Sequence, residues 1–353
     1  MRRKPLRPIK DGLSLNYSML DNIDVRHSKI KNNIKEKEMA INRDRNNTRQ
    51  RTRTIFVPVG GGGSNIKTEE LSVSENGTYE AGEDKAYSKV TVKVTKPLGT
   101  VKIAGTGMKL GYSSFSKVPE WVDFEGVTDM NKMFYVCGNL STIPLIDTSS
   151  VTDMTSMFDF CKSLTTIPLI DTSSVTNMDS MFNYCESLTT IPLIDTSSVT
   201  NMNSMFNHCK SLTTIPLIDT SSVTNMNSMF NVCYLLTTIP QLDTSRVTRM
   251  ISMFGYCESL TTIPLIDTSS VTSMISMLYR CSKLTDLGGF IGLKCDLDLS
   301  PSSLITHDSL MNVINKAADV TASPKTLTLG STNLAKLSDE EKAIATNKGW
   351  TLA

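Results

Sequence analysis

Apolar side chains recur along residues 115–290 with a period of 24 residues. Three consecutive units contain the identical run TTIPLIDTSSVTNM, at 165–178, 189–202 and 213–226. One cysteine marks each period: Cys137, Cys161, Cys185, Cys209, Cys233, Cys257 and Cys281. A fixed period of this length is typical of proteins in which each repeat forms one structural unit that stacks on the next. The pattern therefore predicts a solenoid.

The apolar positions of one repeat predict a strand and then a short helix. Leu212, Ile215 and Leu217 have the spacing of a strand with alternate side chains directed inward, so a strand is expected over 212–218. The polar run DTSS that follows predicts a turn. The next apolar residues recur at steps of three and four, which is typical of one face of a helix or 3₁₀ turn: Val223, Met226, Met229, Phe230 and Cys233.

Proline stands at the same place in six successive predicted strands: Pro144, Pro168, Pro192, Pro216, Pro240 and Pro264. Because proline has no N–H group to donate, the sheet between coils is expected to be short and partly unpaired. In one unit Gln241 occupies the position of a predicted inward leucine. We expect that coil to be locally rearranged.

The combination DTSxVTxMxxMFxxCxSL, at 171–188 and 195–212, resembles the BspA-type leucine-rich-repeat family of bacterial and phage surface proteins. The resemblance covers about half of the chain, over 115–290. It implies an α/β repeat fold, that is, a leucine-rich-repeat-like solenoid with short parallel strands and short helices over 99–290. It also implies a non-enzymatic role in adhesion or display.

Residues 291–353 are expected to form an α/β cap that covers the last coil. Ser338 with Glu341 has the spacing of a capping box that opens a helix, and Gly349 can end that helix. The sequence KTLTLG at 325–330 predicts a strand. An earlier helix is expected to direct one apolar face inward: Leu310, Val313, Ile314 and Ala317.

The N-terminal part of the chain is basic, with 15 Lys and Arg against 6 Asp and Glu in residues 1–53. We predict a helical anchoring arm over 1–54 that binds other virion proteins, of the capsid or the tail, through its charges. The arm carries no apolar stretch of the kind found in export signals or membrane spans, which favours a virion protein assembled in the host cytoplasm. The proposed anchoring residues are Arg2, Arg3, Lys4, Arg43, Arg45, Arg49, Arg51 and Arg53.

Residues 20–41 contain apolar side chains at heptad spacing: Leu20, Ile23, Ile30, Ile34 and Ile41. Isoleucine at both a and d positions favours a trimer, and the alternative is an amphipathic helix packed on a partner. A glycine-rich linker is expected over 55–66. The segment 67–98 has an Asn-Gly turn and alternating valines, which predict a small β module similar to those of phage tail and baseplate proteins.

Comparison of the repeats with one another locates the positions where sequence varies, namely the two residues before each cysteine and the one after it. Exposed aromatic side chains there could stack on sugars or anchor protein contacts. The proposed receptor-binding residues are Tyr135, Phe160, Tyr184, His208, Tyr234, Tyr256 and Tyr279. The alternative is that these rings only cover helix ends. A rival apolar strip is expected on the strand side: Ile146, Ile170, Ile194, Ile218 and Ile266.

Two further columns of side chains have structural explanations. The cysteines lack CxxC pairs or partnered histidines, so buried thiols are favoured over disulfides or a metal site. The aspartates could bind calcium, but each begins a DTS turn in which its carboxylate can accept a local hydrogen bond. They are Asp147, Asp171, Asp195, Asp219, Asp243 and Asp267. Neither a metal ion nor a cofactor is expected.

Catalysis is disfavoured because the three histidines, His27, His208 and His307, lie in different segments without nucleophile motifs. We therefore expect a phage virion structural protein, of fibre or decoration type, that adheres to a host-surface glycan or protein. We expect a homo-oligomer, for which the heptad pattern favours three chains, that neither inserts into membranes nor binds nucleic acid. The alternatives are a purely structural virion spacer and a bacterial cell-surface adhesin without a recognisable export signal.

Overall fold

The computed structural model describes residues 129–353 without a break, together with Gly111, residues 116–118 and the backbone of four strands between 69 and 104. The chain divides into two compact units, Met1–Thr48 and Arg49–Ala353, and all described residues belong to the second. The predicted anchoring arm, its heptad residues and the glycine-rich linker lie outside the described residues. Among the described residues, no helix is long and apolar enough to cross a membrane.

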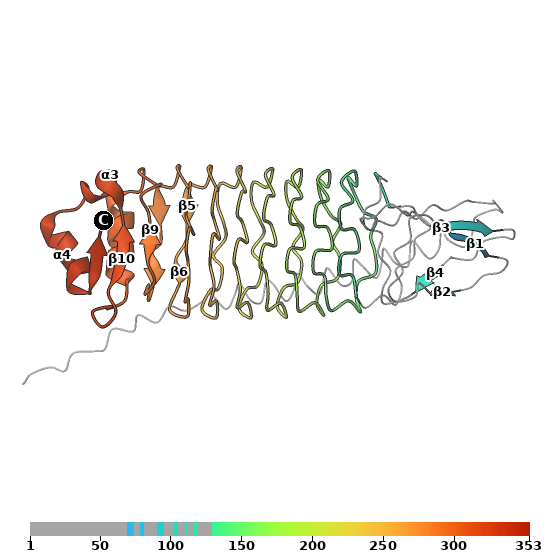
Figure 1. Cartoon of the computed structure of the whole chain (residues 1–353), viewed down its shortest axis with the longest axis horizontal. Helices are drawn as coiled ribbons and strands as arrows, with labels where there is room; N and C mark the ends of the chain where they lie inside the picture. Colours follow the sequence, from blue (N-terminus) through green and yellow to red (C-terminus); the bar gives the residue numbers. More distant parts are fainter. Residues whose placement is uncertain are drawn as a thin grey trace, which may run out of the picture. The chain divides into compact units, whose positions relative to one another are not determined.

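From residue 129 onward the chain winds in coils that stack in a single row (Figure 1). Parallel bridges join equivalent residues of successive coils, as in Asn177↔Asn201 and Asn201↔Asn225. The last coils form short parallel pairs: β5 (Thr262–Ile263) with β7 (Asp286–Leu287), and β6 (Ile266–Asp267) with β8 (Phe290–Ile291). The predicted 24-residue repeat with small parallel strands is therefore present.

The segment predicted as a helix, around 226–233, is instead a chain of tight turns that bonds to the next coil. Ser228 donates its N–H to the carbonyl of Ile251 at 2.8 Å, and Phe230 donates to Met253 at 2.9 Å. The residues between them donate within the coil to the carbonyl three residues back, as Met229 does to Met226. Intra-coil and inter-coil hydrogen bonds thus alternate.

Backbone conformation explains why this segment is not helical. Ser228 and Val232 have positive φ, 52° and 62°, and the equivalent residues of every described coil do the same. A residue in the left-handed region interrupts a right-handed helix after less than one turn. The predicted short helix is therefore absent from the coils, whereas the alternative of a single turn with hydrogen bonds to the carbonyl three residues back is present. The described helices lie between 307 and 347.

The predicted strand over 212–218 is also absent, and its inward side chains differ from those expected. Leu212, Ile215 and Ile218 are buried, whereas Leu217 is 39% exposed. Pro216 fixes φ and removes a donor, and inward residues here recur every third position rather than every second. As a result, the isoleucines proposed as an exposed apolar strip belong to the core, where Ile146, Ile170, Ile194, Ile218 and Ile266 are all buried.

Gln241 accordingly belongs to the outward column rather than the core. Its Nε2 donates to the carbonyl of Leu265 in the next coil at 2.7 Å, and the following Leu242 is buried as usual. The expected local rearrangement does not occur, because an outward position accepts a polar side chain without changing the packing.

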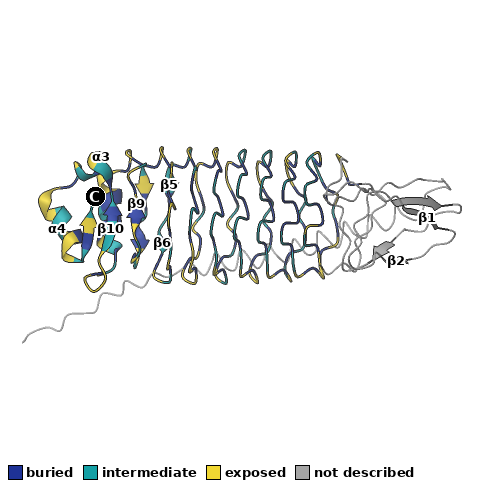
Figure 2. Ribbon diagram, in the orientation of Figure 1, coloured by how far each residue is buried: buried dark blue, intermediate teal, exposed yellow. Residues whose placement is uncertain are grey.

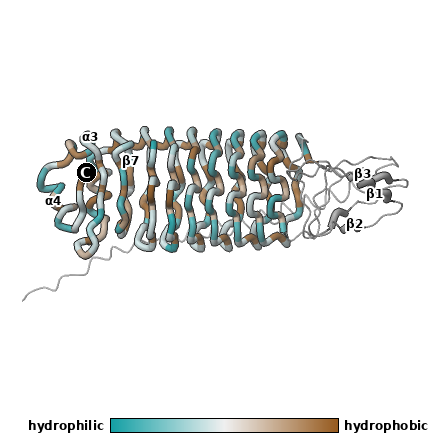
Figure 3. Tube along the Cα trace, in the orientation of Figure 1, coloured by the Kyte–Doolittle hydropathy of each residue, from teal (hydrophilic) through white to brown (hydrophobic). Residues whose placement is uncertain are grey.

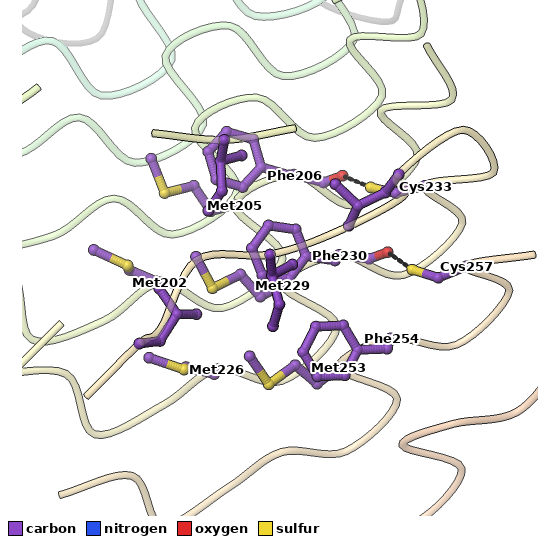
Figure 4. Close-up of a cluster of buried hydrophobic side chains, with 14 of the residues drawn as sticks. Met202, Met205, Phe206, Met226, Met229, Phe230, Cys233, Met253, Phe254 and Cys257 are labelled. Atoms are coloured by element: carbon purple, nitrogen blue, oxygen red, sulfur yellow. Dashed lines mark hydrogen bonds between the residues drawn. The ribbon is translucent and has the colours of Figure 1, made fainter. Parts of the chain in front are cut away.

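The interior of the coils is built from columns of identical side chains, one from each coil. Figure 2 shows the buried residues on the inner side of each coil, and Figure 3 shows how hydrophobic and hydrophilic segments alternate along it. Phenylalanine rings stack in a column: Phe206 lies 5.7 Å from Phe182 and 5.6 Å from Phe230 between ring centroids. Methionines pack beside the rings (Figure 4).

Each described thiol of the cysteine column from Cys161 to Cys281 donates to a phenylalanine carbonyl of the preceding coil. Cys233 Sγ, for example, lies 3.1 Å from the carbonyl oxygen of Phe206 (Figure 4). All seven cysteines of the column are buried, and none of them forms a disulfide. Burial raises the pKa of the six thiols from Cys161 to Cys281, to about 12 for Cys281, so these six stay protonated at neutral pH. The structure confirms the column as buried thiols.

Four strands precede the coils: β1 (Glu69–Val73), β2 (Thr78–Glu80), β3 (Val90–Val94) and β4 (Lys102–Ala104). β1 pairs with β3 and β2 pairs with β4, both in parallel. The strands joined through the Asn-Gly segment are thus not partners of each other, and β4 lies beyond the predicted end of the module at residue 98.

The C-terminal segment packs on the last coils as one α/β unit. Its parallel sheet has the order β11 (Trp350–Leu352), β10 (Lys325–Thr328), β9 (Leu297–Asp298). Its helices are α2 (His307–Lys316), α3 (Gly330–Leu334) and α4 (Asp339–Asn347).

Several details of the C-terminal unit were predicted. α2 buries Leu310, Val313 and Ile314, and Ser338 forms the predicted capping box with Glu341 at the start of α4. Gly349 follows α4 with a φ of 85°. His307 Nε2 lies 2.9 Å from Glu341 Oε1, which links α2 to α4.

Candidate ligand-binding strip

The variable positions of successive coils lie beside one another and form a strip along the stack. We define the strip as the two residues before each cysteine and the one after it, over the coils from Cys137 to Cys281. The second residue of each pair has a φ between 55° and 63°: Val136, Phe160, Tyr184, His208, Val232, Tyr256 and Arg280. Because the backbone repeats this conformation, side chains of successive coils leave it in the same direction.

Three rings of the strip stack face to face. Phe160 and Tyr184 have centroids 4.4 Å apart with planes inclined by 6°, and Tyr184 and His208 have centroids 4.0 Å apart with an inclination of 13°. Tyr135 meets Phe160 edge-on at 6.2 Å. The faces of Tyr184 are therefore covered by its neighbours, so this ring can reach a ligand through its edge and hydroxyl but not through a face.

A row of alternating charges accompanies the stacked rings. Glu186 lies between two lysines, with Oε1 3.3 Å from Lys162 Nζ and Oε2 2.8 Å from Lys210 Nζ. The hydrogen bond from Lys210 lowers the pKa of Glu186 and raises that of Lys210 itself. Glu186 and Lys210 are therefore ionised at neutral pH. Such surface pairs position side chains more than they stabilise the fold.

His208 closes the stacked group as a neutral ring. Its Nδ1 lies 2.9 Å from Asn207 Oδ1, and partial burial, with a smaller effect of Lys210, lowers the pKa of the imidazole. The ring is thus mostly uncharged at pH 7 and stacks on Tyr184 as an aromatic group rather than a cation.

Beneath the rings, the first residues of the pairs bond to one another between coils. Asn183 Nδ2 donates to Asp159 Oδ1 at 2.9 Å, and Asn231 Nδ2 donates to Asn207 Oδ1 at 3.1 Å. Asp159 is buried, and this burial raises its pKa to about 6 despite the hydrogen bonds from Asn183 and Ser156 that favour the charged form. The stacked rings of the strip are therefore accompanied by a row of hydrogen-bonded polar side chains that contains one carboxyl group.

Replacing Asp159 with asparagine is expected to stabilise the protein at pH 8 by about 2 kcal/mol and to have little such effect at about pH 3. The folded-state pKa of about 6 lies above the ordinary value of 3.8, so ionisation costs stability as pH rises through this interval. Below the ordinary value both states are protonated and the cost disappears. Urea denaturation at the two pH values measures the difference.

The matched control for this prediction is Glu258→Gln, which removes an exposed carboxylate of the same strip and is expected to change stability little at either pH. An equal gain for Asp159→Asn at about pH 3 and at pH 8 would show that packing, not ionisation, is responsible.

The proposed receptor residues do not form one continuous group. Tyr135, Phe160, Tyr184 and His208 lie together, and Tyr256 and Tyr279 form a second pair with centroids 5.2 Å apart. Val232 carries no ring and separates the two. Tyr234 follows the cysteine of that coil and is 36% exposed. Among the described residues, its ring contacts no ring of either group.

Sequence reasoning placed the charged side chains at variable positions of the strip but proposed only the aromatic residues and His208 as receptor-binding. Lys162, Glu186 and Lys210 form the charge row, and Arg280 lies over both rings of the second pair, 5.4 Å from the centroid of Tyr256 and 5.9 Å from that of Tyr279. The charge row could have been predicted from the sequence, because Lys162, Glu186 and Lys210 alternate in charge at intervals of 24 residues.

The aspartates of the column accept hydrogen bonds within their own turns, which is the structural one of the two roles considered for them. Asp219 Oδ1 accepts hydrogen bonds from the N–H and the hydroxyl of Ser221, at 2.9 and 2.7 Å, and the other described turns repeat this arrangement. Thr220 Oγ1 donates to the carbonyl of Asp243 in the next coil at 2.8 Å. The DTSS run thus closes each turn and joins it to the next.

Comparison with known proteins places the coils in a family. A family model described as "Mycoplasma protein of unknown function, DUF285" matches residues 107–217 and 211–290, which together make up just over half of the chain. No curated protein matches the chain. The matched residues are those of the 24-residue repeats, in agreement with the BspA-like resemblance of their sequence. The chain therefore belongs to the DUF285 family.

Proposed function

We propose that this chain is a non-enzymatic adhesion protein in which a leucine-rich-repeat-like solenoid displays the strip to a host-surface glycan or protein. The observation that carries the proposal is that side chains that differ between repeats come together on one surface, where Phe160, Tyr184 and His208 contact one another across three coils. A spacer needs no such contacts between residues that vary, because the repeated residues already hold the coils together.

The arrangement suits binding by many weak contacts. Ring edges, a tyrosine hydroxyl and alternating charges recur at the spacing of the coils, so a long partner could contact several coils at once. Linked weak contacts raise the overall affinity well above that of each contact alone. Aromatic side chains held rigidly by their neighbours lose little conformational entropy on binding.

The carrier of this solenoid is proposed to be a phage virion, to which the basic segment 1–54 attaches by binding other virion proteins, as a trimer if its heptad pattern forms a coiled coil. The support is the charge asymmetry of the sequence, with a basic N-terminal segment and an acidic remainder. The family description, which names Mycoplasma, favours the second candidate, an adhesin of a bacterial surface. Mass spectrometry of purified particles and of bacterial envelopes separates these carriers.

Removal of three stacked rings, Phe160→Ala with Tyr184→Ala and His208→Ala, is expected to weaken binding to cells of the host culture at least about tenfold. The reason is that the variant loses the ring edges and the tyrosine hydroxyl that the strip presents. Stability should fall by roughly 1.5–4.5 kcal/mol, for three lost ring pairs. Flow cytometry with the fluorescently labelled full chain measures binding.

The control is Leu217→Ala, which removes an exposed apolar side chain outside the strip and should bind like the unaltered chain. Binding is compared at a temperature at which both variants are folded by circular dichroism. If the triple variant binds as well as the control, the strip is not the adhesive surface and a purely structural spacer becomes the better account.

A further inference from the structure

The C-terminal end of the strip differs in geometry from the stacked rings. The planes of Tyr256 and Tyr279 are inclined by 75°, so their faces do not cover each other. Tyr279 is 43% exposed, and Arg280 beside it is exposed as well. This end therefore presents open ring surface, which Tyr184 in the stacked group cannot offer.

Arg280 also differs from the lysines of the strip in its partners. Lys162 and Lys210 are both paired with Glu186, whereas the ion pairs found among the described residues include none of Arg280. Its guanidinium group lies over two tyrosine rings instead. A side-chain hydrogen bond also joins Arg280 to Tyr279. Because a guanidinium carries five N–H donors, the donors that Tyr279 does not use remain for another acceptor.

We propose that Tyr256, Tyr279 and Arg280 bind an acidic sugar, a pyranose that carries a carboxylate on its ring. The planar guanidinium supplies two parallel N–H donors, which match the two oxygens of a carboxylate. The exposed ring of Tyr279 packs against the apolar C–H face of the same sugar. This inference rests on the proposed adhesive function and names the ligand class for one end of the strip.

The spacing of the two contacts favours a sugar over a carboxylate of a protein side chain. The guanidinium carbon lies 5.4 and 5.9 Å from the two ring centroids. The cation and a ring can therefore contact neighbouring parts of one small ligand. In a uronic or sialic acid the carboxylate is attached directly to a rigid ring that has an apolar face. An Asp or Glu side chain carries its carboxylate on a flexible stem without such a face.

The test measures binding of the full chain to a uronate-containing tetrasaccharide and to its carboxyl-reduced counterpart, by isothermal titration calorimetry. We expect the acidic form to bind at least about tenfold more tightly, the size of one charge-assisted contact. Arg280→Gln should abolish this preference. Arg280→Lys should recover only part of it, because lysine keeps the charge and loses the paired donors. Tyr279→Leu should weaken binding of both forms and also reduce the preference, because it removes the stacking ring and a contact that holds Arg280.

Lys283→Gln is the matched control, since it removes an exposed positive charge close to Arg280 in the sequence and should leave the preference unchanged. A sialylated trisaccharide and its reduced form serve as a second pair of probes. Equal binding of acidic and reduced forms, absence of binding to both acidic probes, or an Arg280→Gln variant that keeps the preference would each overturn the inference. Failure here with cell binding that still depends on Phe160, Tyr184 and His208 leaves the adhesive function standing.

Discussion

Replacing Phe206 with alanine is expected to lower the free energy of unfolding by about 3–5 kcal/mol. The ring is fully buried and lies between Phe182 and Phe230 in the core column. Its own backbone cannot move to fill the cavity, because its N–H donates to Met229 at 2.9 Å and its carbonyl accepts the thiol of Cys233 at 3.1 Å. A site that cannot collapse retains the full cost of the lost contacts.

Leu217→Ala is the comparison for this substitution, since it also removes a large apolar side chain but from the outward column. It is expected to cost less than about 1 kcal/mol. Urea denaturation followed by circular dichroism measures both variants. Similar losses in the two variants would mean that the ring column contributes no more than an exposed leucine, contrary to the packing described above.

Replacing Gly288 with alanine is expected to destabilise the last coils by roughly 3 kcal/mol, at the upper end of the usual cost of overpacking. A Cβ atom there would lie 2.4 Å from the backbone nitrogen of Leu265 and 2.8 Å from its Cα. Both are backbone atoms of the preceding coil. The coils cannot separate freely, because the N–H of Gly288 donates to the carbonyl of Ile263 at 2.9 Å.

Gly138→Ala tests whether the clash is responsible, because the nearest atom to its Cβ would be the carbonyl oxygen of Phe160 at 4.0 Å. Both substitutions restrict the unfolded chain to the same degree. Gly138→Ala should therefore be neutral or slightly stabilising, within about 0.5 kcal/mol. Thermal unfolding of the two variants decides the matter, and equal melting temperatures would refute the proposed close approach of the coils.

The period and most of the core could be predicted from the sequence, whereas the local backbone of a coil could not. Steps of three and four residues between Met226, Met229, Phe230 and Cys233 fit a helix as well as a series of turns. The deciding feature is positive φ at Ser228 and Val232, and neither residue is glycine, so no local signal announces it. Hydrogen bonds to the next coil, such as Phe230 to Met253, stabilise these turns and are invisible to local propensity.

The strip was located from the sequence because comparison of repeats needs only the period. Which rings would cover each other could not be predicted, since this depends on side-chain direction at left-handed residues such as Tyr184 and His208. The sequence also placed Leu217 in the core and Ile218 on the surface, whereas the structure shows the reverse. The predicted spacing L-x-x-I-x-L and the observed three-residue step both place Leu212 and Ile215 inward, and they diverge only after Pro216.

The hydrogen bonds between successive coils are the same along the stack, so the number of coils can change without any change in how the coils bond to one another. Each coil receives its hydrogen bonds from partners 23 to 27 residues away, such as Thr200 with Thr224 and Phe206 with Cys233. A duplication or loss of 24 residues within the identical units would restore every one of these bonds. Unequal recombination between the repeated gene segments could therefore lengthen or shorten the reach of the protein in one step, while both the cap and the Arg280 end of the strip remain intact.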